Sequence, residues 1–104
     1  MPELTYADAL REALREEMFR DPRVVLMGEE IGVFEGVYKV TRGLLKEFGP
    51  ERVRDTPISE AAIAGAAVGA ALGGLKPVAE IMYMDFLTIC LDQIATNAAK
   101  MHFM

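Results

Sequence analysis

The chain has 104 residues, with 16 acidic against 11 basic side chains and a formal net charge of −5. This charge argues against nucleic acid as a partner, because phosphate binding needs clustered Lys and Arg. A single cysteine, Cys90, excludes a disulfide framework and favours a reducing compartment. The start of the chain does not resemble a signal peptide, and the most apolar stretch, 61–75, is shorter than the roughly 20 residues of a membrane span. We therefore expect a cytoplasmic protein with no membrane partner.

Helices and strands alternate along the predicted secondary structure. In chain order we predict a helix at 5–20, a strand at 24–27, a short helix at 41–48, a strand at 52–55, a helix at 60–72, a strand at 78–83 and a helix at 85–102. Thr5 and Ser59 are the expected N-caps, and Gly49-Pro50 and Gly73-Gly74 are the expected stops. The run Val-Val-Leu-Met at 24–27 is typical of a strand buried on both faces.

This alternation predicts one α/β domain over residues 1–104, built on a parallel sheet with right-handed crossovers. Ligands of such sheets bind outside the carboxyl ends of the strands. Three segments leave those ends: 28–30, 57–60 and 82–86. We therefore expect acidic side chains and an apolar, aromatic corner to lie along one edge, as a small pocket for a flat heterocycle.

Glu60 is the first candidate site residue, because it opens a helix otherwise made of alanine, glycine and aliphatic residues. An acid at a helix start can simply stabilise the helix dipole, by about 0.3–1 kcal/mol. Burial among apolar neighbours would instead raise its pKa and prepare it for proton exchange. Glu29 is the second acidic candidate, and Met82 and Phe86 are either plain core residues or the apolar wall of the pocket.

Glycines recur every four residues in the helix at 60–72 and just beyond it, at Gly65, Gly69 and Gly73. They form a smooth ridge that another backbone can approach closely. The ridge fits either tight packing within the chain or a contact between subunits.

Three segments together resemble the β subunit of 2-oxo acid dehydrogenase E1 components: MGEEIG, FGPERVRDTPISEAAIAGAAVGAALGGLKPVAEIMYMDF and LDQIATNAAKM. This resemblance implies the start of a thiamine-diphosphate pyrimidine-binding domain of the transketolase type. It implies that Glu60 binds the aminopyrimidine ring nitrogen and that Glu29 lies close to the cofactor. It also implies that the Ile58 backbone lies along the ring, with Met82 and Phe86 lining and stacking on it. None of these residues is expected to bind a metal.

The same resemblance implies oxidative decarboxylation of a 2-oxo acid such as pyruvate, with transfer to a lipoyl carrier. The expected partners are an E1 α subunit that holds the diphosphate and Mg²⁺, a second β subunit and a lipoyl-bearing E2. Another thiamine enzyme of transketolase type and a non-catalytic assembly module are the alternatives.

The chain shows no stop signal for its last helix before Met104, and hydrophobic residues make up 52% of it. Both features indicate apolar surfaces meant for a partner or for further sequence. We therefore expect an incomplete domain that is inactive and prone to aggregation by itself.

Overall fold

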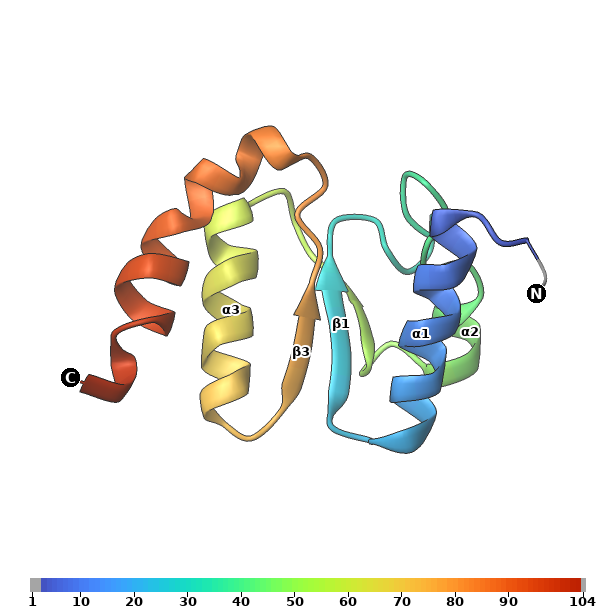
Figure 1. The fold of residues 1–104 in the computed structure, drawn as a ribbon, viewed down its shortest axis with the longest axis horizontal. Helices are drawn as coiled ribbons and strands as arrows, with labels where there is room; N and C mark the ends of the chain where they lie inside the picture. The colour runs from blue at the N-terminus through green and yellow to red at the C-terminus, as the bar shows by residue number, and fades with distance from the viewer. Residues whose placement is uncertain (1–2, 104) are drawn as a thin grey trace.

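The computed structural model describes residues 3–103 as an α/β arrangement of stacked layers (Figure 1). The elements are α1 Tyr6–Arg20, β1 Val24–Gly28, α2 Leu44–Phe48, β2 Val53–Asp55, α3 Glu60–Leu72, β3 Lys76–Ala79 and the helical segments η1 Met84–Cys90, η2 Asp92–Ala98 and η3 Met101–Phe103. One face of the sheet packs on α1 and α2, and the other packs on α3. The helical arm η1–η3 lies outside α3 (Figure 1). The predicted order of helices and strands is confirmed.

The sheet is parallel, in the order β2-β1-β3, as predicted. All five residues of β1 are buried, because the strand is central and covered on both faces. Val24 and Leu26 point into a core beneath α1 and α2, whereas Val25 and Met27 point into a second core beneath α3. This alternation explains why the continuous apolar run predicted a buried strand.

Both predicted N-caps are confirmed. The Thr5 hydroxyl accepts the Asp8 N–H at 3.1 Å, and the Ser59 hydroxyl accepts the Ala62 N–H at 3.4 Å. The short helix α2 begins at residue 44 rather than 41, because Gly43 before it has a left-handed φ of 78°. Cys90 is buried, as expected, and its thiol donates to the Leu87 carbonyl.

The third strand was predicted at 78–83, but β3 spans Lys76–Ala79. Pairing with β1 decides its position, because the backbone N–H groups of Lys76 and Glu80 donate to Arg23 and Met27 carbonyls of that neighbour, both at 2.9 Å. Pro77 lies between them, where its missing N–H faces the open edge of the sheet. Proline is tolerated in a strand only at such an edge.

The single helix predicted at 85–102 is also wrong in detail. The chain is helical there but passes through a 3₁₀ segment, a π segment and a second 3₁₀ segment. Residues of low helix propensity, such as Thr88, Ile89 and Asn97, are frequent in the arm. The arm packs on α3 along one side only and leaves Ile89, Leu91 and Ile94 exposed, so little tertiary packing favours a regular helix over its whole length.

The glycine ridge on α3 has a neighbour from its own chain at one end. A Cβ at Gly65 would lie 3.3 Å from the Gln93 side chain of η2, whereas a Cβ at Gly69 would meet no atom within 4 Å. Close packing within the chain therefore explains Gly65. The subunit contact stays a prediction.

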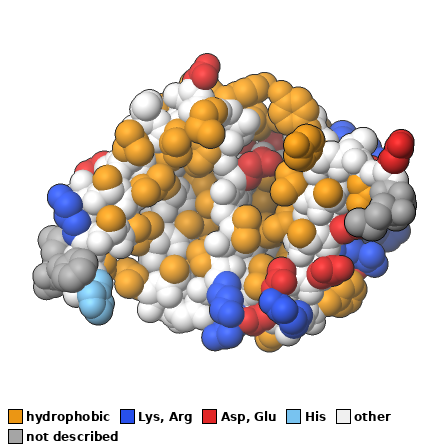
Figure 2. Space-filling view, in the orientation of Figure 1, with side chains coloured by type: hydrophobic (Ala, Val, Ile, Leu, Met, Phe, Trp, Pro, Cys, Tyr) orange, Lys and Arg blue, Asp and Glu red, His pale blue; other side chains and the backbone are white. Residues whose placement is uncertain are grey.

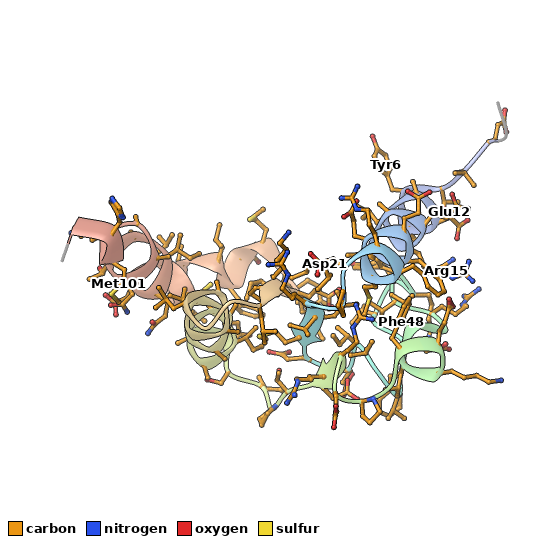
Figure 3. All side chains as sticks on the ribbon, turned by 90° about the horizontal axis from the view of Figure 1, so that it is seen from below. Tyr6, Glu12, Arg15, Asp21, Phe48 and Met101 are labelled. Carbon is orange, nitrogen blue, oxygen red and sulfur yellow. The ribbon has the colours of Figure 1, made fainter. Side chains whose placement is uncertain are left out.

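Two helices are tied to each other on the opposite side of the sheet (Figure 3). The Arg15 guanidinium donates to both carboxylate oxygens of Glu47, at 2.7 and 2.8 Å, and stacks 5.5 Å over the Phe19 ring. Phe19 meets Phe48 edge to face at 4.9 Å, and the Arg52 guanidinium covers Phe48 from 5.1 Å. This alternating row of cations and rings holds α1 against α2.

Candidate functional site

The carboxyl ends of β1, β2 and β3 meet at one edge of the sheet, beside the first turn of α3 (Figure 1). Gly28 lies opposite Asp55 in the register, and the Thr56 N–H donates to the Gly28 carbonyl at 2.9 Å. The three segments singled out from the sequence therefore come together in space. Residues 57–60 and 82–86 arrive from opposite sides of the central strand.

Two carboxylic acids are buried at this edge: Glu29 is 6% exposed and Glu60 is 9% exposed. Glu60 lies in the first turn of α3, next to buried Ile63 and Ala64. Glu29 follows the last residue of β1, and its Oε1 is buried without a hydrogen-bond partner among residues 3–103. An unsatisfied buried acceptor is costly and indicates a group that is completed by something from outside the chain.

Burial raises the pKa of Glu29 above its ordinary value, and the negative charge of nearby Glu60 and a hydrogen bond with its carboxyl raise it further. A carboxyl group close to another acid is harder to ionise, so Glu29 keeps its proton to a higher pH than an exposed glutamate does. Charges on Glu30 and Glu80 act in the same direction. The site can therefore hold and pass a proton next to an apolar surface.

Glu80 is a third acid at this edge that the sequence analysis missed. It leaves the end of β3 and lies beside β1, because a Cβ built on Gly28 would approach the Cβ of Glu80 to 3.0 Å. Burial raises the pKa of Glu80. The predicted strand at 78–83 placed this residue in mid-strand, whereas an acid directly after the apolar pair Val78-Ala79 was the available signal for a strand end.

Asp55 was treated only as the end of a strand, although its carboxylate organises the loop after β1. It accepts the backbone N–H of Gly32 at 2.6 Å and that of Val33 at 3.1 Å. The D-T-P-I-S-E stretch therefore supplies one residue to the acid pair and another to the loop that carries its partner.

The remaining predicted site residues form the less buried part of this edge. Met82 is half-buried, and Phe86 is 40% exposed with its ring 6.1 Å from that of Tyr83, edge to face. The Ile58 side chain is 82% exposed and so points away from the buried pair. Phe86 and Tyr83 offer an accessible aromatic surface, and at Ile58 only the backbone remains a candidate contact.

In the view of Figure 2, apolar side chains gather across the middle of the molecule, between α3 and α1. A cavity of about 230 Å³ lies there between α1 and β3, and Glu80 is its charged lining residue. No helix within residues 3–103 is long and apolar enough to cross a membrane. Over the same range, no cluster of three or more His, Cys, Asp or Glu side chains forms a metal site.

Replacing Glu29 by glutamine is expected to change how stability depends on pH. Because the folded pKa of Glu29 lies above its ordinary value of 4.5, the folded chain keeps a proton that the unfolded chain has released. Glu29 therefore favours folding fully below pH 4.5, and that contribution is lost as pH rises through the folded pKa. Glu29→Gln should reduce the fall in melting temperature from pH 4.5 upward.

The matched control for this change is Glu12→Gln, on the exposed face of α1 (Figure 3). It removes one carboxylate far from the acid pair and should leave the pH dependence of the wild type. An identical pH dependence in both variants would contradict the buried, proton-retaining state of Glu29. Glu80 titrates in the same direction, so some of the slope should survive in Glu29→Gln.

The class of protein follows from this fold and edge together with the match to a known family. Residues 2–104 match the family described as "Transketolase, pyrimidine binding domain". The chain belongs to this family, which agrees with the parallel sheet and with the fold predicted from the sequence.

Within this family, the chain is similar to one kind of subunit. The chain is 52% identical over 102 residues to the pyruvate dehydrogenase E1 component subunit beta of Rickettsia bellii (strain RML369-C), covering 98% of this chain and 31% of that protein. It is 53% identical over 102 residues to the mitochondrial pyruvate dehydrogenase E1 component subunit beta-1 of Arabidopsis thaliana, covering 98% of this chain and 28% of that protein. The chain thus spans less than a third of the length of these relatives.

Proposed function

We propose that this chain is part of the β subunit of a thiamine-diphosphate-dependent 2-oxo acid dehydrogenase E1 component. The reaction is oxidative decarboxylation of a 2-oxo acid, with transfer to a lipoyl carrier. The observation that carries the proposal is the buried pair of acids, Glu29 and Glu60, at the carboxyl edge of a pyrimidine-binding fold. Pyruvate is the favoured substrate, because the relatives that the chain resembles are pyruvate dehydrogenase subunits.

The residues at the edge fit an aminopyrimidine ring. Such a ring has a basic nitrogen and an amino group in one plane, with apolar faces. The raised pKa of Glu29 favours a proton at this edge, which suits a ring nitrogen, and the unpartnered Glu29 Oε1 is a buried acceptor that an external N–H group can satisfy. Phe86 supplies a partly exposed ring for stacking, which contributes about 0.5–1.5 kcal/mol beyond simple burial.

In this proposal Glu60 is the proton-exchanging residue at the ring nitrogen. Glu29 lies beside Glu60 at the end of β1, and the apolar start of α3 excludes water around both side chains. Met82 and Phe86 fix the plane of the ring, and the Ile58 backbone bounds it. Thiamine diphosphate, when bound, supplies the electron sink that decarboxylation of a 2-oxo acid requires.

We propose that the rest of the site comes from other chains. An E1 α subunit holds the diphosphate and Mg²⁺, a second β subunit completes an α₂β₂ assembly, and a lipoyl-bearing E2 receives the product. The exposed apolar side chains of the helical arm, Ile89, Leu91, Ile94 and Met101, are surfaces that such an assembly can cover. We expect this assembly in the cytoplasm.

The test is reconstitution of the full-length subunit with its α partner. We expect the assembly to bind thiamine diphosphate in calorimetry and to release CO₂ from pyruvate in the presence of Mg²⁺. Branched-chain 2-oxo acids, acetoin and sugar phosphates serve as competing substrates. Turnover of sugar phosphates alone would favour the transketolase alternative, and an assembly without cofactor binding would favour the non-catalytic module.

A further inference from the structure

Asp55 connects the two backbone segments that carry the buried acids, the loop after β1 with Glu29 and the turn after β2 with Glu60. It is the last residue of β2, and the chain from it reaches Glu60 after a short turn. Across the register it lies opposite Gly28, directly before Glu29. Its carboxylate bonds to Gly32 and Val33 bring the loop after β1 back onto the end of β2. The Asp55 side chain therefore joins the segment after β2 to the loop after β1.

Gly32 makes the short contact possible. A Cβ at this position would lie 2.7 Å from Asp55 Oδ2 and 3.1 Å from its Cγ, which is closer than carbon and oxygen atoms can pack. Gly32 is not in the left-handed region within the part of the chain that the structure describes, so space and not backbone conformation requires glycine here. The loop and the carboxylate fit each other as a matched pair.

The loop between Glu29 and Val33 is also held by its carbonyl groups, since the Glu30 carbonyl accepts the Gly36 N–H at 2.8 Å and the Gly32 carbonyl accepts the Glu35 N–H at 3.2 Å. Ile31 anchors it in the core at 1% exposure, and its carbonyl accepts the Thr41 hydroxyl at 2.6 Å. Glu30 lies in the left-handed region, with a φ of 55°, which is unfavourable for a residue with a Cβ. Without the Asp55 carboxylate, two loop N–H groups would lose a charge-assisted acceptor. The Gly32–Val33 end of the loop would then shift from the end of β2, and we expect Glu29 at the other end of the loop to shift with it.

We propose that Asp55 is a positioning residue that holds Glu29 against Glu60, and that the Gly32–Asp55 contact sets the geometry of the acid pair. The expected effect on turnover rests on the proposed function, whereas the positioning of Glu29 by Asp55 does not. Asp55 itself is largely exposed and acts through the loop, not by contact with a substrate.

The test is a double-mutant cycle in the full-length subunit assembled with its α partner. Asp55→Ala and Gly32→Ala should each lower the turnover number on the order of 10–100-fold, because misplacing a reacting group by about an ångström has this effect. KM for the 2-oxo acid should stay nearly constant. Since Gly32→Ala acts by clashing with the Asp55 carboxylate, adding it to Asp55→Ala should change turnover by less than about twofold.

A second readout does not depend on turnover. Isotope-edited infrared spectra recorded across a pH titration should show the Glu29 carboxyl losing its proton at a higher pH in the wild type than in both single variants. Gly32→Ala carries no change of charge, so its effect would come from geometry alone. Asp55→Asn, which keeps only one of the two acceptor oxygens, should fall between the wild type and Asp55→Ala.

Asp21→Asn is the matched control, because Asp21 also accepts from a backbone N–H, that of Arg23, and forms ion pairs with Arg23 and Lys76, but at the opposite edge of the sheet. It should lower the melting temperature without changing turnover or the Glu29 signal. Independent, additive effects of Asp55→Ala and Gly32→Ala, or an unchanged Glu29 signal in both, would overturn the proposal. A wild-type assembly that binds no thiamine diphosphate would refute the proposed function, while the infrared comparison would still decide the role of Asp55.

Discussion

Replacing Glu60 by glutamine in the assembled enzyme is expected to lower decarboxylation by about 10²–10⁴-fold, the range typical of a lost general acid–base group. Glutamine keeps the size of the side chain and can still hydrogen-bond, but it cannot exchange a proton. The Ser59 hydroxyl caps α3 through the Ala62 N–H, and Glu60 forms no ion pair within residues 3–103, so the helix should remain intact. Turnover and cofactor affinity, measured side by side, check this result.

The control for this change is Glu12→Gln, which removes an exposed carboxylate of α1 (Figure 3). It should retain wild-type turnover. Size-exclusion chromatography should show the same assembly for both variants, so that a loss of activity cannot be attributed to dissociation. Wild-type turnover in Glu60→Gln would remove Glu60 from the mechanism.

Arg52→Ala is expected to produce the largest loss of stability, roughly 2–3 kcal/mol, since hydrogen bonds to charged groups contribute about 1.5–3 kcal/mol. The Arg52 guanidinium donates to the Met18 carbonyl at 2.8 Å, to the Asp21 carbonyl at 2.9 Å and to the Val24 carbonyl at 3.0 Å. These acceptors lie at the end of α1 and the start of β1. One cation therefore neutralises the negative end of the helix dipole and joins α1, β1 and the Phe48 ring.

Hydrogen exchange of the α1 and β1 amides in the full-length assembly measures this loss locally. Arg54→Ala is the matched control, because Arg54 is two residues away, exposed, and donates to the Glu51 carbonyl at 2.8 Å. It should change the same exchange rates little. Equal effects of the two variants would show that Arg52 is an ordinary surface arginine.

Much of the fold could be predicted from the sequence because local rules and burial agree there. The apolar run predicted as a strand at 24–27 lies in the buried strand β1, and the N-caps Thr5 and Ser59 start their helices where predicted. The alternation of helices and strands required a parallel sheet. The sequence resemblance also predicted the protein family, and the comparison with known proteins confirms that prediction.

The structure alone decided which polar groups share a space. Glu60 opens a helix in the sequence, but its burial beside Glu29 depends on β1 lying between β2 and β3, a pairing of segments far apart in the chain. Glu80 was missed because hydrogen bonds to β1 fix the end of β3, and the acid after Val78-Ala79 was only a weak local signal of that end.

The sequence by itself determined the elements, their order, the parallel class of the sheet and the family resemblance, because these depend on side-chain periodicity, caps and short motifs. Tertiary structure decided the strand register, the acid cluster, the Asp55–Gly32 contact and the irregular course of the helical arm. The physical reason is that pKa shifts, close contacts and helix regularity depend on the neighbours that packing brings together across the chain.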